Sequence, residues 1–208
     1  GFYQERSHNI IPSSSCMIEN ENARIVINEV LDLLNESNIY PYNEEAHTGD
    51  LRHLVLRCNS KNEFMLILVL RENKPKIHSF IAKIKSPLIK SLYININPNK
   101  TNVILGKEFI HVGGDEYIEE ALFGNKFNIH LNSFFQVNYA QMKKLYKCAI
   151  DLLDAKPTDT VIDAYSGIGT ITLSIAPHVK KIYGIEVVEE AVVNANENKA
   201  RNNITNAE

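Results

Sequence analysis

The sequence lacks the features that define several broad classes of protein. Its longest apolar run, FMLILVL at 64–70, falls far short of the roughly 20 residues of a membrane-spanning helix, so we expect no membrane partner. Its three cysteines, Cys16, Cys58 and Cys148, are odd in number and widely spaced, which favours reduced thiols over a disulfide framework. The opening residues GFYQERSHNIIP lack the charged and apolar regions of a signal peptide, so we expect a cytoplasmic protein.

An excess of positive charge is also missing. Lys and Arg number 22 against 25 Asp and Glu, and the formal net charge of -3 argues against a uniformly basic nucleic-acid binder. Local basic patches remain compatible with RNA binding. The seven histidines show no HExxH pattern or other close metal-ligand spacing. With 44% hydrophobic residues, the chain has the composition of one large globular domain or two small ones.

The first part of the chain, residues 1–125, is predicted to be a mixed α+β central domain. Apolar residues at helical or alternating spacing, separated by polar and glycine-rich turns, define its elements. We expect helices over 16–35 and 76–86, a hairpin of strands at 51–59 and 63–71, a strand over 89–97, and short strands around 109–112 and 117–122. Gly113-Gly114 and Gly124-Asn125 are predicted to form turns.

The second part, residues 126–208, alternates strand and helix patterns after a short strand at 126–130. Helices are expected over 137–156, 169–178 and 189–203, and strands over 160–165 and 180–187. This alternation predicts a parallel α/β sheet, and thus the beginning of a Rossmann-like domain. A doubly wound sheet runs to about six strands, so we expect the chain to be a fragment of a longer protein.

The segment VIDAYSGIGTITLSIA at 161–176 places a glycine turn between a strand and a helix. Gly167 and Gly169 permit a ligand to approach the backbone closely, and Glu186 stands at the end of the next strand, where an acid can accept hydrogen bonds from ribose hydroxyls. A tight turn without a ligand is the alternative. The dinucleotide fingerprint wants a third glycine where Thr172 stands, which favours S-adenosylmethionine over a nicotinamide cofactor.

Several segments together resemble a known family. They are NSFFQVN at 132–138, VIDAYSGIGTITL, IYGIEVVEEAV and, upstream, GFYQERSHNIIPSSSC, HTGDLRHLVLR and NINPNKTNVILG. The chain is similar over nearly its whole length to RNA uracil-5 methyltransferases, which form 5-methyluridine, and most to the branch that modifies ribosomal RNA. The resemblance implies an S-adenosyl-L-methionine-dependent methyltransferase acting on 23S ribosomal RNA, with tRNA a weaker candidate. A nicotinamide-dependent oxidoreductase and a non-catalytic RNA-binding module remain the alternatives.

The resemblance also implies roles for individual residues. Gln136 is expected to bind the methionine portion of the cofactor, Tyr165 to form a wall of the site, and Glu186 to hold the ribose, beside the turn at Gly167. Ser166 replaces a cysteine that many relatives carry, a near-isosteric change from which we expect little effect on binding.

Family chemistry requires a cysteine nucleophile in an SCNP-like motif and a base, and neither position occurs in this sequence. We therefore assign no catalytic residue and expect the chain alone to be inactive, with Cys58 and Cys148 as small buried core residues. The resemblance makes Cys16 a possible ligand of a 4Fe-4S cluster, although the three upstream cysteines and the TRAM domain of the family are absent.

RNA contacts are expected from basic residues of the first part of the chain. They are Arg6, Arg52, Lys74, Lys76, Lys83, Lys85 and Lys90, together with the segment NPNKTN. A Rossmann-like domain of so few strands would leave a sheet edge and apolar faces exposed, so we also expect self-association of the chain.

Overall fold

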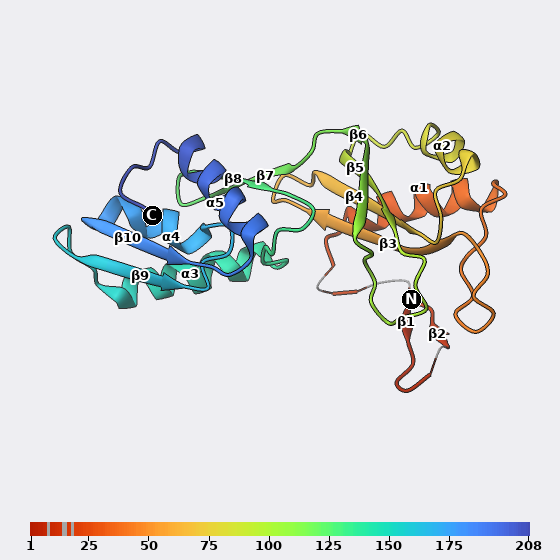
Figure 1. The fold of residues 1–208 in the computed structure, drawn as a ribbon, viewed down its shortest axis with the longest axis horizontal. Coiled ribbons are helices and arrows are strands. Elements are labelled where there is room, and N and C mark those ends of the chain that lie inside the picture. Colours follow the sequence, from red (N-terminus) through yellow and green to blue (C-terminus); the bar gives the residue numbers. More distant parts are fainter. Residues whose placement is uncertain (8, 14–15, 18) are drawn as a thin grey trace. The chain divides into compact units, whose positions relative to one another are not determined.

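The computed structural model describes residues 1–7, 9–13, 16, 17 and 19–208, and this part of the chain forms two compact units (Figure 1). The first unit comprises Gly1–Arg57 and Asn62–Asp115, and the second comprises Cys58–Lys61 and Glu116–Glu208. The sequence places the boundary at 125/126. The structure places it at 115/116, because the strand hairpin over 118–129 packs against the last helix of the second unit.

The first unit is built on a four-stranded sheet of order β3-β4-β5-β6, with a separate β1–β2 pair near the N-terminus. Its elements are β1 (Phe2–Tyr3), β2 (Ile10–Ile11), α1 (Ala23–Asn35), β3 (Leu51–Cys58), β4 (Phe64–Leu70), α2 (Pro75–Ile81), β5 (Ile89–Ile96) and β6 (Glu108–Gly114). β3 lies next to β4, and β5 pairs antiparallel with β6.

The core of the first unit lies between this sheet and the helices α1 and α2 (Figure 1). Every residue of β4 is buried, which its unbroken apolar run predicts. Its alternate side chains Leu66, Leu68 and Leu70 pack with Val30 of α1 and Ile77 of α2. β4 and β5 are parallel, so the chain must cross over between them, and α2 forms that crossover.

Two local predictions in this unit are wrong. Helix α1 begins at Ala23 rather than near Cys16, because the Asn20 carboxamide accepts a hydrogen bond from the Asn22 amide at 2.9 Å and forms an Asx turn instead of a helical turn. Gly113 and Gly114 are the last residues of β6 rather than a turn. A side chain on Gly114, at φ +71°, would strike the Lys90 carbonyl, so this close strand contact requires glycine.

The second unit combines a strand hairpin with an α/β segment. Its elements are β7 (Ile118–Leu122), β8 (Asn125–Ile129), α3 (Tyr139–Leu153), β9 (Thr160–Ala164), α4 (Thr170–Ile175), a 3-10 turn (Ala176–His178), β10 (Lys181–Ile185) and α5 (Glu189–Arg201). Phe123 and Gly124 turn the hairpin with φ +48° and +84°, which is typical of a tight two-residue turn. In the described part of the chain no helix has the length and hydropathy needed to span a membrane.

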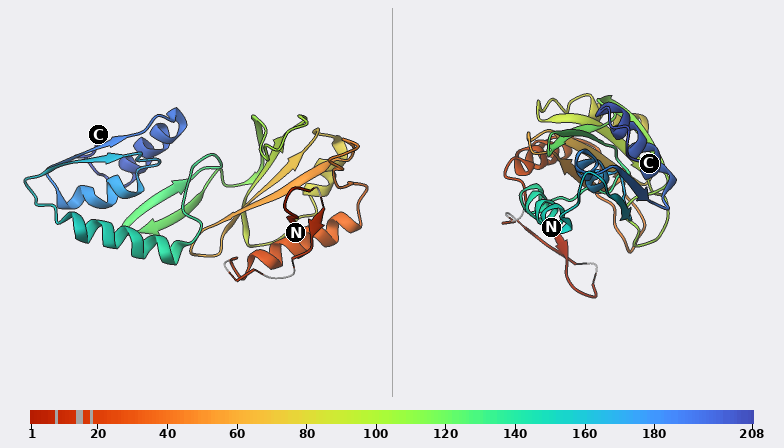
Figure 2. Two further views of the ribbon diagram at one scale, coloured as in Figure 1. Left: turned by 90° about the horizontal axis from the view of Figure 1, so that it is seen from below. Right: turned by 90° about the vertical axis from the view of Figure 1, so that its left-hand side faces the viewer.

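Strands β9 and β10 pair in parallel with Thr160 opposite Lys181 and Ala164 opposite Ile185. Their carboxyl ends therefore reach the same edge of the sheet, the edge at which α/β folds bind ligands. Figure 2 shows α4 and α5 next to this strand pair. Ile162 and Ile185 lie on one face of this strand pair and are 64% and 54% exposed. The self-association expected from such exposed apolar residues stays a prediction.

Candidate cofactor site

The turn that joins β9 to α4 has an unusual backbone. Tyr165, Gly167 and Gly169 all adopt left-handed conformations, with φ of +65°, +55° and +82°. Glycine takes this conformation without strain, whereas a tyrosine is uncommon there. The Ser166 amide donates to the Ile185 carbonyl at 3.0 Å, and the Gly169 amide donates to the Ser166 carbonyl at 2.9 Å. The first bond holds the turn against the end of β10, and the second closes the turn itself.

Glu186 lies against the same turn. Its Oε2 accepts a hydrogen bond from the Gly167 amide at 3.0 Å, and its Oε1 accepts from the amides of Val187 and Val188 at 2.7 and 2.9 Å. The hydrogen bonds from Val188, Val187 and Gly167 lower the pKa of this carboxyl, because each one favours the charged form. The predicted turn and the predicted ribose-binding acid are therefore brought into direct contact, and the acid is ionised at neutral pH.

Asp163, next to the last residue of β9, links the strand to helix α4 behind the turn. Thr172 of α4 donates its hydroxyl proton to Asp163 Oδ2 at 2.6 Å. Burial raises the pKa of Asp163, and the hydrogen bonds from Thr172 only partly offset that effect. Gly184 of β10 lies beneath both the turn and α4, since a Cβ placed on it would come within 2.9 Å of Ser166 Oγ and 3.2 Å of Thr172 Oγ1.

The outer side of the turn is open. A Cβ placed on Gly167 would meet no atom within 4 Å, and the side chain of Tyr165 is 90% exposed. An exposed aromatic ring, a bare glycine backbone and an ionised carboxylate together suit an adenosine-containing ligand, because the carboxylate accepts hydrogen bonds from hydroxyl groups and the ring offers an apolar wall. These residues fit the cofactor that the sequence predicts.

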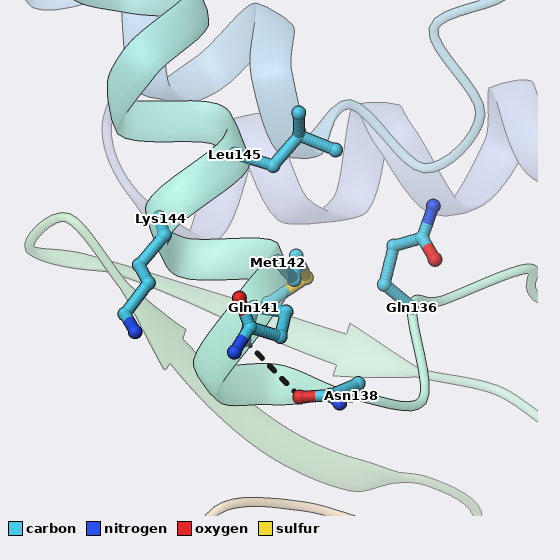
Figure 3. A pocket seen from close by; sticks show the side chains of 6 residues that line it. All are labelled: Gln136, Asn138, Gln141, Met142, Lys144 and Leu145. Carbon is cyan, nitrogen blue, oxygen red and sulfur yellow. Dashed lines mark hydrogen bonds between the residues drawn. The ribbon is translucent and has the colours of Figure 1, made fainter.

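Gln136 lies in the loop between β8 and α3 and lines an open pocket of about 440 Å³. The other lining residues come from the start of α3; they are Asn138, Gln141, Met142, Lys144 and Leu145 (Figure 3). Asn138 caps α3 by accepting the Gln141 amide at 3.1 Å. Gln136 extends from the loop, apart from the five side chains at the helix (Figure 3). Tyr165, Gly167 and Glu186 do not line this pocket.

Comparison with known proteins identifies the family. Residues 62–208 match the tRNA (uracil-5-)-methyltransferase family. The chain belongs to this family. RNA methyltransferases of Streptococcus mutans and Halalkalibacterium halodurans, both described as uncharacterised, are 45% and 42% identical over 99% and 100% of the chain, and the chain covers 47% and 46% of their lengths. It thus spans about half the length of the curated relatives it matches.

A solved structure also matches. The Pyrococcus abyssi tRNA (uracil-54, C5)-methyltransferase in complex with S-adenosyl-L-homocysteine is 27% identical, with a TM-score of 0.82 over 99% of this chain and 50% of that chain. The predicted α/β fold of an S-adenosylmethionine-dependent methyltransferase is confirmed. Family membership and this fold do not favour the nicotinamide-dependent oxidoreductase.

The cysteines differ from expectation in one respect. Cys148 on α3 is exposed and Cys58 is half-buried, so neither is the fully buried core residue that was predicted. Met142 is the one buried residue of α3. The rest of the helix, including Cys148, is therefore not covered by the core. Cys16 is half-buried, and its carbonyl accepts the Glu19 amide at 3.1 Å. Among the described residues no group of His, Cys, Asp and Glu is arranged to hold a metal ion.

Several residues predicted to contact RNA have structural partners instead. The side chain of Arg52 is fully buried and donates to the carbonyls of Asn97, Asn99 and Thr101 at 3.0, 2.6 and 3.2 Å, so it is not available to a phosphate. Lys74 and Lys76 bind the buried carboxylate of Asp50, with Nζ to oxygen distances of 3.1 and 2.5 Å.

The remaining basic candidates are exposed. They are Arg6, Lys83, Lys85, Lys90 and, in NPNKTN, Lys100. Of the residues predicted to contact RNA, these are the ones that remain accessible to a phosphate.

The polar residues that support the site were not predicted from the sequence. Ser133, Asn194 and Asn198 are buried, and they connect α5 to the loop of Gln136 and to the glycine turn. A signal was present, because Asn194, Asn198 and Asn202 recur every four residues in a helix pattern and so lie on one helix face. Asparagine is a poor former of helix interiors, so its repetition on one face indicates a packed polar contact.

Proposed function

We propose that the protein containing this chain methylates C5 of uracil in RNA, and that residues 132–186 hold its methyl donor, S-adenosyl-L-methionine. The observation that carries the proposal is the contact between the Glu186 carboxylate and the Gly167 amide at the carboxyl ends of β9 and β10. The similarity to the Pyrococcus abyssi enzyme bound to S-adenosyl-L-homocysteine supports it.

The residues of the site divide the work of holding this donor. Glu186 Oε2 accepts one hydrogen bond and keeps a further lone pair for a ribose hydroxyl. The ring of Tyr165 walls the open side of the turn, and the carboxamide of Gln136 offers both a donor and an acceptor to the polar groups of the methionine portion. S-adenosylmethionine, when bound, supplies a methyl group on a positively charged sulfur.

The other reactant is the uracil ring of the RNA. Uracil C5 becomes a nucleophile when a cysteine thiolate adds to C6; C5 then bonds to the methyl group as the bond from that group to the donor sulfur breaks, and loss of the C5 proton to a general base expels the thiolate. Cys16, Cys58 and Cys148 do not occur in the family's motif for this nucleophile. We therefore place the nucleophile and the base in a part of the protein that this chain does not include, and expect the 208-residue chain to bind the donor without methylating RNA.

Ribosomal RNA is the substrate class that we propose. Support comes from the resemblance of the first unit to the ribosomal branch and from its exposed basic residues, such as Lys83, Lys90 and Lys100. Such residues hold RNA through its phosphates, while the target base must leave the stack to reach a methyl donor.

Methyl transfer to defined RNAs tests the proposal. The full-length protein is incubated with labelled S-adenosylmethionine and unmodified 23S ribosomal RNA or tRNA transcripts, and 5-methyluridine is located by mass spectrometry of nuclease fragments. Methylation of a uridine in ribosomal RNA is the expected result. Methylation of tRNA alone would overturn the substrate class, and RNA binding without methylation would favour an RNA-binding module.

Binding of the donor is measured separately. Isothermal titration of the 208-residue chain should show S-adenosylhomocysteine binding that Glu186→Ala abolishes, and no binding of NADH. Binding of NADH in preference would overturn the cofactor assignment.

A further inference from the structure

Helix α5 carries a row of asparagines on one face. Asn194, Asn198 and Asn202 follow one another every four residues, and Asn194 and Asn198 are only 3% and 0% exposed. Asparagine is usually exposed, and a buried carboxamide is costly unless its donor and acceptor are satisfied. The partners of these side chains therefore show what the face is built to hold.

Asn198 ties the glycine turn to a strand. Its Nδ2 donates to the carbonyl of Ile168 at 3.2 Å, and its Oδ1 accepts from the amide of Asn128 in β8 at 2.8 Å. Ile168 lies between the two glycines of the turn. The turn also lies close to α5 at this point, because a Cβ built on Gly169 would lie 3.5 Å from the Cβ of Ala195.

Asn194 holds the other loop of the site. Its Oδ1 accepts the hydroxyl proton of Ser133 at 2.7 Å in a buried hydrogen bond. Ser133 belongs to the same short loop as Gln136, next to the buried Phe135. The position of the Gln136 loop is thus fixed against α5, one helical turn away from the point at which Asn198 holds the glycine turn.

The third predicted contact, Glu186, is fixed to the beginning of the same helix. Its Oε1 accepts the amides of Val187 and Val188, and Val188 is the N-cap of α5. One helix therefore anchors the Gln136 loop, the glycine turn and the ribose-binding acid.

We propose that Asn194 and Asn198 are positioning residues for the methyl donor, which set the spacing of the two loops without touching the ligand. Their burial leaves no surface for a ligand, so any effect they have on its affinity passes through Ser133 and Ile168. The inference rests on the proposed function, since it assigns a role at the same site.

The chain offers a matched control on the same helix face. Asn202, the C-cap of α5, makes two hydrogen bonds to β8, donating to the Lys126 carbonyl at 2.7 Å and accepting the Lys126 amide at 2.8 Å, and it also donates to the Asn198 carbonyl at 2.7 Å. It contacts neither the glycine turn nor the Gln136 loop. Asn202→Ala removes two bonds to β8, whereas Asn198→Ala removes one bond to β8 and one to the glycine turn. A merely structural role of the row predicts the same outcome for both variants.

Two measurements on the full-length protein separate these outcomes. Isothermal titration with S-adenosylhomocysteine should show about tenfold weaker binding for Asn198→Ala and for Asn194→Ala, as expected when supporting hydrogen bonds of a site are lost, and less than about twofold for Asn202→Ala. Hydrogen exchange without ligand should show faster exchange of the Gly167 and Gly169 amides in Asn198→Ala, and not in Asn202→Ala.

A second variant covers the case in which Asn198→Ala does not fold. Ser133→Ala leaves the asparagine row intact and removes the hydroxyl group that donates to Asn194, so it should reproduce the loss of affinity of Asn194→Ala. Equal losses in Asn198→Ala and Asn202→Ala, or unchanged affinity in Asn194→Ala and Asn198→Ala, would overturn the inference. Failure of the unaltered protein to bind S-adenosylhomocysteine would instead overturn the proposed function and, with it, the assignment of these residues.

Discussion

Replacement of Gly184 by alanine tests how tightly the glycine turn packs against β10. The added Cβ would lie 2.9 Å from Ser166 Oγ, 3.1 Å from Ser166 Cβ and 3.2 Å from Thr172 Oγ1. The hydroxyl of Ser166 can rotate away, but its Cβ is fixed to the backbone of the turn, so the turn itself has to move. Inserting a methyl group into a packed site costs about 1–3 kcal/mol.

The effect should appear in both stability and binding. Gly184→Ala is expected to lower the free energy of unfolding by about 1–3 kcal/mol in urea titrations, and to weaken S-adenosylhomocysteine binding because Ser166 is displaced within the turn. Gly113→Ala is the matched control. Gly113 also lies in a β-strand, but a Cβ there has Leu92 Cβ as its nearest neighbour at 4.0 Å, so the change should be neutral or stabilising by up to about 1 kcal/mol.

A double mutant identifies the atoms responsible. Ser166→Gly removes both atoms of Ser166 that the added methyl group would strike, so it should cost less in the Gly184→Ala background than in the unaltered protein, with a coupling free energy of about 1 kcal/mol. A Gly184→Ala variant as stable as the unaltered protein, with unchanged ligand affinity, would refute the packing argument.

Three other substitutions should have effects of known sign. Glu186→Gln should weaken S-adenosylhomocysteine binding severalfold at pH 7, and binding by the unaltered protein should stay constant down to about pH 5, because the pKa of this carboxyl is lowered below its usual range; loss of affinity between about pH 7 and pH 5 would contradict this. Asp163→Asn should raise the free energy of unfolding at about pH 7 but not at about pH 4, because a raised pKa means that stability falls as pH rises through it; equal effects at both values would exclude a role of burial. Asp50→Ala should lower the free energy of unfolding by about 1–2 kcal/mol at pH 7, since it leaves the Tyr40 amide without its carboxylate partner at 3.1 Å. Burial opposes it, but hydrogen bonds from Lys76, Tyr40 and Lys74 lower the pKa of this carboxyl, so the loss should shrink as the pH falls into the acid range; urea titrations would show a loss independent of pH if charge plays no part.

Local sequence patterns were sufficient for the elements that form the site. The alternation of apolar strand, glycine turn and helix between 160 and 185 predicted β9, α4 and β10 within a few residues. The expected meeting of Gly167 and Glu186 follows from the parallel pairing of two strands, because both residues come directly after strand ends that share an edge.

Features that depend on distant partners could not be predicted in the same way. Arg52 looks like a phosphate-binding residue in sequence, but the carbonyls of Asn97, Asn99 and Thr101 surround its guanidinium only once the strands are paired. The beginning of α1 depended on a single competing hydrogen bond, from the Asn22 amide to the Asn20 side chain. Neither contact produces a periodic pattern in the sequence. The partners of Arg52 lie far away along the chain, and Asn20 and Asn22 are only two residues apart.

Two acids that look alike in the sequence receive opposite roles from the fold. Asp163 and Glu186 stand at corresponding ends of neighbouring parallel strands. Burial raises the pKa of Asp163, which accepts the Thr172 hydroxyl on the covered side of the turn, whereas backbone amides lower the pKa of Glu186 on its open edge. The first carboxyl therefore serves the packing of α4 against β9, and the second presents a fixed negative charge. Both residues are half-buried, so the contrast comes from their hydrogen-bond partners, and Glu186 is the one of the two for which we propose a contact with ribose hydroxyls.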